Sequence, residues 1–165
     1  MKVLDLEAAK QKAFRLLSLR PHSEKELEKK LREKGFPAAV VKETLEKLHD
    51  LKYLDDSSFA NQWARNLIVN KVWGNKKVIA GLREKGISAE LINSSIEKAR
   101  EELSEEAAIE ILIKKKTAKQ KSAALDVKEK QKIFQALMGR GFPPGLILDK
   151  LRKIKKEDID GEDRE

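Results

Sequence analysis

Lysine and arginine are the residues of this chain whose number and clustering point most clearly to chemistry. The 165-residue sequence holds 36 Lys and Arg against 28 Asp and Glu, which gives a net charge of +8 and a pI near 9.5. Residues 104–156 hold fourteen basic side chains against six acidic ones, a net charge of +8, whereas residues 157–165 hold one against six. Because concentrated cationic groups bind polyanions, we expect a polyanionic partner, which charge alone does not identify.

The densest basic run, Lys114–Lys116 with Lys119 and Lys121, has two interpretations. In the first it is the solvated face and last turn of a helix, where cations interact favourably with the helix dipole. In the second it is a strip that contacts phosphates. Other basic residues of the same region support the second: Lys128, Lys130, Lys132, Arg140, Lys150, Arg152 and Lys153.

The middle of the chain offers a smaller basic face. Lys76 and Arg83 are seven residues apart, which places them on one face of a helix, away from the apolar positions Val78, Ile79 and Leu82. They are therefore candidates for contact with a partner and not for the core.

Side chains that could catalyse a reaction are scarce. The sequence has no cysteine, and therefore no thiolate metal site and no cysteine nucleophile, as is typical of a reducing cytoplasm. His22 and His49 are the only imidazoles, and both adjoin predicted helix ends, where capping or surface roles are usual. Gly139-Arg140-Gly141 lacks the length and the following Lys-Ser or Lys-Thr of a phosphate-binding loop. We expect no enzyme activity, no cofactor and no metal site.

Two further motifs each have two interpretations. Asp55 and Asp56 could hold a divalent ion, but adjacent carboxylates before Ser57-Ser58-Phe59 more often cap a helix, and we favour a cap. Trp63 and Trp73 could stack on bases. Trp63 shares a helix face with Phe59 and belongs in the core, whereas Trp73 lies in a basic turn and is the better stacking candidate.

The elements that position these residues form repeats. Three segments align without gaps, and their glycines stand 51 and 55 residues apart. Apolar residues recur at spacings of three and four on both sides of each glycine, which predicts two amphipathic helices joined by a glycine turn. Ser23 with Glu26, and Asp126 with Glu129, have the spacing of a capping box at a helix start. The aligned segments are Leu27–Pro37, Val78–Ser88 and Ile133–Pro143.

Each helix pair is preceded by another helix-like stretch, which gives nine helices in three triplets. No run alternates with the period of a strand, so the predicted class is all-α. We expect repeats at 1–52, 53–103 and 104–156, stacked into an elongated curved molecule because each unit alone buries little core. Residues 157–165 form a predicted disordered acidic tail that could compete with a polyanion for the third repeat. With no signal peptide and no apolar stretch of ~20 residues, a soluble cytoplasmic protein is expected.

A family resemblance covers residues 13 to about 100, and the third repeat matches in layout more than in letters. The residues that carry the resemblance are Leu16-Leu17, Arg20, Ser23, Glu26-Leu27, Leu31, Lys34-Gly35-Phe36, Tyr53-Leu54-Asp55-Asp56, Phe59-Ala60, Trp63, Gly74, Ile79, Leu82 and Lys85-Gly86-Ile87. With these residues the chain resembles the bacterial RecX regulatory family.

The resemblance implies three tandem three-helix repeats and a regulator that binds the RecA recombinase and its DNA filament. It further implies that binding restrains the ATPase and strand-exchange activities of RecA in recombination and repair. The motif residues that carry over as architecture are Arg20, Ser23, Leu27, Leu31, Gly35, Asp55, Asp56, Phe59, Gly74 and Gly86. The candidate contacts with RecA or DNA are Arg65, Lys71, Lys76, Lys77, Arg83, Lys114, Lys115, Lys119, Arg140, Arg152 and Lys153.

Two alternatives keep the same fold. The first is a sequence-independent DNA-binding protein, because three-helix units resemble helix-turn-helix modules and the pI is high. The second is a helical-repeat scaffold for another protein, whose charge serves solubility. We expect single- or double-stranded DNA to bind more weakly than the filament and in a salt-sensitive manner, no membrane contact, and a monomer.

Overall fold

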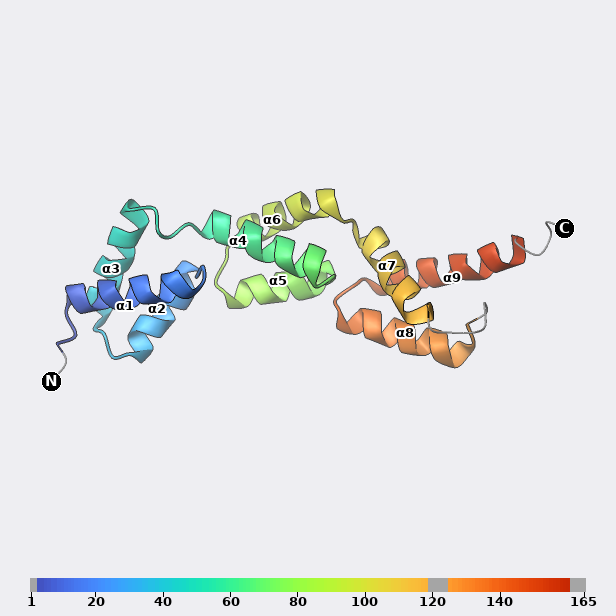
Figure 1. Ribbon diagram of the computed structural model, residues 1–165, viewed down its shortest axis with the longest axis horizontal. Coiled ribbons are helices and arrows are strands. Elements are labelled where there is room, and N and C mark those ends of the chain that lie inside the picture. The colour runs from blue at the N-terminus through green and yellow to red at the C-terminus, as the bar shows by residue number, and fades with distance from the viewer. Residues whose placement is uncertain (1–2, 119–124, 161–165) are drawn as a thin grey trace. The chain divides into compact units, whose positions relative to one another are not determined.

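The computed structural model describes the backbone of residues 3–118 and 125–160, and the side chains of this part up to residue 154. Over these residues the chain forms nine α-helices and no strand (Figure 1), which confirms the all-α class and the nine helices predicted from the sequence. The elongated curved shape and the boundaries of the repeats stay predictions.

The first triplet consists of α1 (Leu6–Leu19), α2 (Glu24–Glu33) and α3 (Ala38–Asp50). Ser23 and Glu26 form the predicted capping box at the start of α2. The three helices surround one core, so the local start and stop signals are consistent with the packing. The buried residues of this core are Ala9, Ala13, Leu27, Leu31, Phe36, Val41, Leu45, Leu48 and Leu54.

The second triplet consists of α4 (Asp56–Arg65), α5 (Asn75–Glu84) and α6 (Ala89–Glu102). A π-helical turn, Asn66–Asn70, continues α4, and the N–H of Lys71 closes it by donating to the carbonyl of Asn66 at 3.1 Å. Val72 follows in the left-handed region with φ of 56°, which is strained for a β-branched residue. The chain therefore enters the segment before α5 through irregular backbone.

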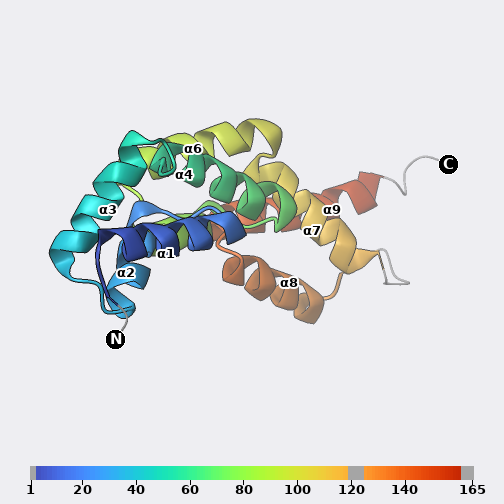
Figure 2. The same ribbon diagram turned by 60° about the vertical axis from the view of Figure 1, so that its left-hand side comes forward.

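The third triplet consists of α7 (Glu105–Thr117), α8 (Val127–Gly139) and α9 (Pro144–Asp160). Asp126 and Glu129 form the second predicted capping box, at the start of α8. Helix α9 continues through residues 157–160, which the sequence assigned to the acidic tail, and residues 161–165 lie outside the described part. Figure 2 shows α7, α8 and α9 gathered around one another. Their buried residues are Ala108, Ile109, Leu112, Ile113, Ile133, Leu137, Phe142, Ile147 and Leu151.

Glycine turns join the last two helices of every triplet. Gly35, Gly86 and Gly141 have φ of 92°, 76° and 92°, a region that glycine enters at little steric cost. Packing divides the chain into two compact units: one holds residues 1–63 and 81–95, the other 64–80 and 96–165. The helices of the middle triplet thus contribute to both units.

Candidate nucleic-acid interface

Trp73 lies between two lysines in the segment that precedes α5. The Lys77 Nζ atom is 4.1 Å from the centroid of the Trp73 ring, and the Lys71 Nζ atom is 5.6 Å from it. Cations at these distances are attracted by the ring's negative face. The ring is half-buried, so part of it stays accessible beside two ammonium groups.

Arg100 fixes the backbone of this segment. Its guanidinium donates to the carbonyl of Trp73 at 2.8 Å, to the side-chain oxygen of Asn75 at 2.8 Å and to the carbonyl of Leu103 at 3.2 Å. Burial lowers the pKa of Arg100, whereas the charges of Glu105 and Glu106 raise it. Sequence reasoning missed Arg100, because one arginine in an acidic helix carries no spacing signal.

The segment is also joined by backbone contacts to the turn between α8 and α9. The N–H of Gly74 donates to the carbonyl of Arg140 at 2.8 Å, and the N–H of Lys76 donates to the carbonyl of Gly141 at 3.2 Å. A Cβ atom at Gly74 would overlap the backbone of Gly141, so only glycine fits here. The Arg140 guanidinium donates to the carbonyl of Lys71 at 2.7 Å.

These contacts bring together four of the predicted contact residues: Lys71, Lys76, Lys77 and Arg140. We call these four with Trp73 the Trp73 cluster. Within the described residues, none of the three lysines lies within 4.0 Å of a carboxylate. Uncompensated cations beside an accessible indole can pair with phosphates while a base stacks on the ring.

Arg65 and Arg152, also predicted contacts, have carboxylate neighbours instead. The guanidinium of Arg65 donates to both carboxylate oxygens of Glu102, at 2.7 and 2.9 Å. This paired geometry lowers the pKa of Glu102 and raises that of Arg65. Arg152 lies 3.9 Å from Asp149, one turn away on the same helix. Both arginines are exposed, but each would have to leave an acidic partner to bind phosphate.

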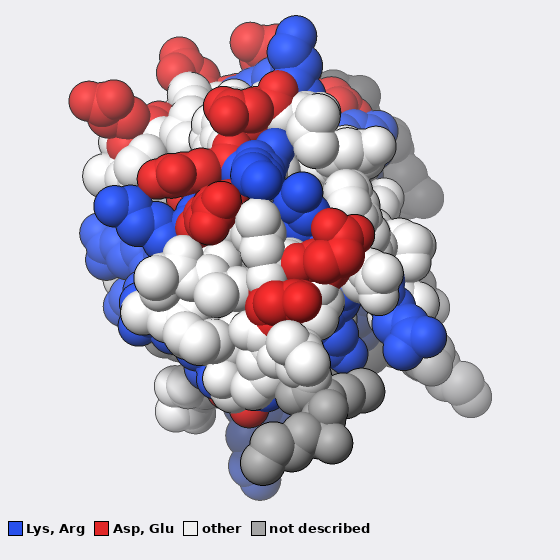
Figure 3. Space-filling view, turned by 90° about the vertical axis from the view of Figure 1, so that its left-hand side faces the viewer, with Lys and Arg blue, Asp and Glu red and all other residues white. Residues whose placement is uncertain are grey.

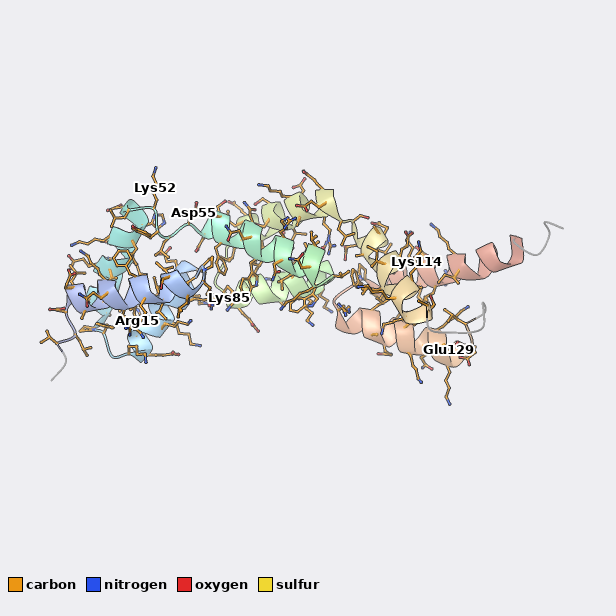
Figure 4. All side chains as sticks on the ribbon, in the orientation of Figure 1. Arg15, Lys52, Asp55, Lys85, Lys114 and Glu129 are labelled. Carbon is orange, nitrogen blue, oxygen red and sulfur yellow. The ribbon has the colours of Figure 1, made fainter. Side chains whose placement is uncertain are left out.

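A second basic group lies between α7 and α9, around Glu110. The Lys150 Nζ atom is 2.5 Å from a Glu110 oxygen, and Lys114 and Lys153 line the same groove of about 200 Å³. Figure 4 labels Lys114 on α7. The hydrogen bond from Lys150, followed by the charges of Lys114 and Lys153, holds the pKa of Glu110 below its ordinary value. Three lysines thus share one carboxylate, which leaves net positive charge.

The remaining predicted contacts do not join either group. Lys115 is exposed on α7, next to Lys114 but outside the groove. Arg83 is exposed near the end of α5, in the compact unit that does not contain the Trp73 cluster. Lys119 lies outside the described residues.

A different aromatic site occupies the first compact unit. The Trp63 ring stacks on Phe59, with 5.5 Å between ring centroids, and carries Lys85 at 5.2 Å and Arg20 at 5.9 Å from its own centroid. Both cations bind Glu26, at 2.9 and 2.6 Å. Burial alone raises the pKa of Glu26, but hydrogen bonds from Arg20, Lys85 and the Ser23 N–H outweigh it and lower the pKa to about 2.

This site differs in part from the sequence predictions. Trp63 is half-buried and not fully in the core, and the cations of Arg20 and Lys85 lie within 6 Å of its ring centroid. His22 is 4% exposed, so a surface role is wrong. Its Nδ1 atom is 2.9 Å from the carbonyl of Arg20, and its Nε2 atom is 2.8 Å from Lys30 Nζ. A neutral ring satisfies both contacts by donating from Nδ1 and accepting at Nε2.

Asp55 and Asp56 cap helices, as favoured from the sequence. The Asp55 carboxylate accepts from the N–H of Ser58 at 3.1 Å, in the first turn of α4. The Asp56 carboxylate accepts from the N–H of Glu24 at 3.0 Å, at the start of α2. Asp55 therefore caps its own helix, whereas Asp56 links the second triplet to the start of α2 in the first.

Charge over the first triplet is mixed. Figure 3 shows basic and acidic side chains interleaved on the face that it presents, without one continuous basic area.

Among the described residues, no helix is long and apolar enough to cross a membrane.

Comparison with known proteins identifies the family to which this arrangement of three-helix units belongs. Models of the first, second and third three-helix domains of RecX match residues 9–48, 55–96 and 104–158. The regulatory protein RecX of Mycolicibacterium smegmatis is 30% identical over 146 residues, which cover 87% of this chain and 77% of that protein. The chain belongs to the RecX family.

Other members of the RecX family agree with this assignment. The regulatory protein RecX of Pelodictyon phaeoclathratiforme is 33% identical over 143 residues, which cover 86% of each chain. The crystal structure of RecX from Lactobacillus salivarius shares the fold, with a TM-score of 0.78 and 23% identity over 92% of this chain and 97% of that one. The resemblance that the sequence carried is therefore confirmed.

Proposed function

We propose that this RecX-family chain binds the RecA recombinase and its DNA filament and thereby restrains ATP hydrolysis and strand exchange by RecA. The observation that carries the proposal is the Trp73 cluster, in which Lys71 and Lys77 lie beside a half-buried indole. Among the side chains that the structure describes, no carboxylate lies within 4.0 Å of the three lysines of the cluster. The basic group around Glu110 supplies further positive charge in the same compact unit.

The proposed mechanism needs binding alone. A filament alternates between states during hydrolysis and exchange, and a ligand that prefers one state slows every step that requires another. Phosphate contacts from the Trp73 cluster would hold the chain against the DNA that RecA encloses. Each phosphate that is neutralised adds to the salt dependence, so binding should weaken as salt rises.

Helix α6 argues against the simplest alternative, in which the third helix of a triplet enters the major groove of DNA. In helix-turn-helix proteins the recognition helix presents side chains to base edges and must tolerate the nearby phosphates. Helix α6 carries four glutamates against one lysine and one arginine, and Arg100 is already bonded to the Trp73 segment. A duplex would meet net negative charge there. The glutamates are Glu90, Glu97, Glu101 and Glu102, all exposed.

The test is RecA-dependent ATP hydrolysis and strand exchange on single-stranded DNA, with the chain added below one molecule per RecA. Inhibition that persists in excess competitor DNA supports a RecA regulator. Inhibition that competitor DNA abolishes identifies simple DNA sequestration, and the absence of inhibition identifies a scaffold for another protein.

A pair of matched variants ties this activity to the site. Lys76→Glu with Lys77→Glu should reduce inhibition at least about tenfold, because two phosphate contacts become repulsive. Lys42→Glu with Lys98→Glu changes the net charge equally at exposed positions outside the cluster, and should leave inhibition within about twofold of the parent. Equal inhibition by both variants would place the interface elsewhere.

A further inference from the structure

The groove between α7 and α9 is lined with the same spacing on both helices. Residues that are three and four positions apart lie on one face of a helix, so each helix presents one face to the groove. Helices α7 and α9 pack against each other, as Figure 2 shows. The lining residues are Glu110, Ile113 and Lys114 on α7, and Lys150, Lys153 and Ile154 on α9.

The three lysines of this groove differ in their contact with water. Lys114 and Lys153 are exposed, whereas the side chain of Lys150 is only 12% exposed. The inner side of the groove is apolar, because Ile113 belongs to the core of the third triplet and Ile154 packs against that core. A lysine stem commonly packs on such a surface while its ammonium group stays in water. Of these three lysines, Lys150 is therefore the one whose charge is largely withdrawn from water.

Lys150 depends on a nearby anion for this reason. A cation that is withdrawn from water destabilises the fold unless an opposite charge compensates it. Glu110 supplies that charge, with a carboxylate oxygen 2.5 Å from the Lys150 Nζ atom. The Glu110 side chain is 53% exposed, so it can rotate into water without disturbing the core. Glu110 is thus an exchangeable partner of Lys150, provided that another anion takes its place.

The charge and the size of the groove favour a phosphate as that other anion. Three lysines surround one carboxylate, so the groove keeps a net positive charge. Phosphate oxygens accept charge-assisted hydrogen bonds from ammonium groups as carboxylate oxygens do. The volume of about 200 Å³ is smaller than the roughly 300–1,000 Å³ of pockets that enclose a complete small ligand. The groove therefore suits one phosphate of a strand and not a whole nucleotide.

We propose that this groove binds one phosphate of a DNA backbone, and that the phosphate displaces Glu110 from Lys150. Glu110 is then an internal competitor of DNA, because the groove holds either its carboxylate or the phosphate. The proposal rests on the proposed function, since it requires that this compact unit contacts DNA, and it adds the residue that limits the affinity. Glu110 thereby keeps the binding of free DNA weak.

Replacing Glu110 by glutamine tests the exchange. Glutamine keeps the size of the side chain and still accepts a hydrogen bond from Lys150, but it has no charge with which to oppose a phosphate. The affinity for a labelled single-stranded oligothymidylate is measured by fluorescence anisotropy without RecA. Glu110→Gln should bind at least about fivefold more tightly than the parent, because one charge-assisted hydrogen bond is gained. The slope of log affinity against log salt should steepen by about 0.7, the value for one further phosphate of a single strand.

Two further variants separate the exchange from a general effect of charge. Glu101→Gln removes the same charge at an exposed position of α6 in the same compact unit. It should change the affinity by less than about twofold, because salt screens charges that do not contact the strand. Lys150→Gln should abolish the gain, so that Glu110→Gln with Lys150→Gln binds no more tightly than Lys150→Gln alone. Circular dichroism and thermal unfolding establish that all variants fold.

A gain that persists without Lys150, or that Glu101→Gln reproduces, would reduce the effect to net charge and overturn the exchange. Titration with inorganic tripolyphosphate distinguishes the two sources of phosphate. A gain for tripolyphosphate but not for oligothymidylate would assign the groove to a free anion and overturn the DNA assignment.

Failure of this proposal can be told apart from failure of the proposed function, because these measurements contain no RecA. Unchanged oligothymidylate affinity of Glu110→Gln, together with intact inhibition of RecA by the parent, would overturn the exchange alone. Absence of RecA inhibition by the parent would instead count against the proposed function.

Discussion

Replacing Glu26 by glutamine removes one negative charge from the site around Trp63 and keeps the side chain's shape. Glutamine also serves at this position of a capping box, so the start of α2 should persist. Arg20 and Lys85 then face each other without the carboxylate that both contact, at 2.6 and 2.9 Å. The expected result is a loss of stability in the first compact unit.

The size of the loss follows from the pKa of Glu26. Its lowering from the ordinary value of 4.5 to about 2 corresponds to about 3.4 kcal/mol, at about 1.36 kcal/mol for each tenfold change in proton affinity. The Glu26 side chain is only 9% exposed, but those of Lys85 and Arg20 are 25% and 36% exposed, so solvent screens part of the interaction. We expect Glu26→Gln to lower the free energy of unfolding by about 2–3 kcal/mol at pH 7.

The same pKa fixes the dependence on pH. Because the folded chain binds the proton of Glu26 less tightly than the unfolded chain, the carboxylate stabilises the fold fully above pH 4.5. That contribution is lost as the pH falls from 4.5 through about 2. The difference between the parent and Glu26→Gln should therefore be constant between pH 6 and 8 and should shrink below pH 4.5.

The assay is urea unfolding followed by the fluorescence of Trp63, with Trp73→Phe in both proteins so that the signal reports the first compact unit alone. Comparison at pH 7 and pH 3 gives the two differences. Equal stability of the two proteins at pH 7, or a difference that does not shrink at pH 3, would refute the reasoning about this carboxylate.

Three further predictions concern other parts of the chain. Gly74→Ala should lower the free energy of unfolding by about 2–3 kcal/mol, because the new Cβ atom overlaps the backbone of Gly141. Gly139→Ala should raise the free energy of unfolding by about 0.5–1 kcal/mol, because Gly139 lies in a helix with open space around it. Thermal unfolding measures both changes. Burial lowers the pKa of His22, and the charges of Arg20 and Lys30 lower it further. The hydrogen bond with the Arg20 carbonyl and the charge of Glu26 raise the pKa, but they do not outweigh the burial. Because the folded chain binds the proton of His22 less tightly than the unfolded chain, the free energy of unfolding should fall as the pH drops below 6.5. A His22→Gln variant in the same unfolding assay should lose that slope between pH 5 and 6.5, and an unchanged slope would assign it to another group. Lys77→Gln should weaken binding to DNA of any sequence and reduce the slope of log affinity against log salt by about 1, measured by fluorescence anisotropy, whereas an unchanged slope would remove Lys77 from the phosphate contacts.

The helix pairs were predictable because their signals are local. The apolar spacing around Gly35, Gly86 and Gly141, and the capping boxes that begin at Ser23 and Asp126, each lie within one or two turns of chain. The π-helical turn after Arg65 was not predicted, because nothing in Asn66–Asn70 distinguishes it from a continued α-helix. The strained backbone of Val72 and the orientation of the segment after it follow from this turn, and only the structure shows them.

The Trp73 cluster could be predicted only in part. Lys76 was identified from its helix face, Lys77 only among the candidate contacts of the middle repeat, and Arg140 from the charge of its own repeat. Their proximity depends on the contact between Gly74 and Gly141, 67 residues apart. The pairing of Arg65 with Glu102, 37 residues away, likewise could not be predicted, because no local sequence pattern indicates it. The burial of His22 was missed because its partner Lys30 lies eight residues away, on the next helix.

Binding to preformed RecA filaments on single-stranded DNA tests the central proposal most directly. The labelled chain is titrated with filament and with the same DNA without RecA, and the affinities are compared for the parent and for Lys76→Glu with Lys77→Glu. The account predicts tighter binding of the parent to filament than to bare DNA, and at least about tenfold weaker filament binding by the variant. Equal affinity of the parent for filament and for bare DNA would contradict it.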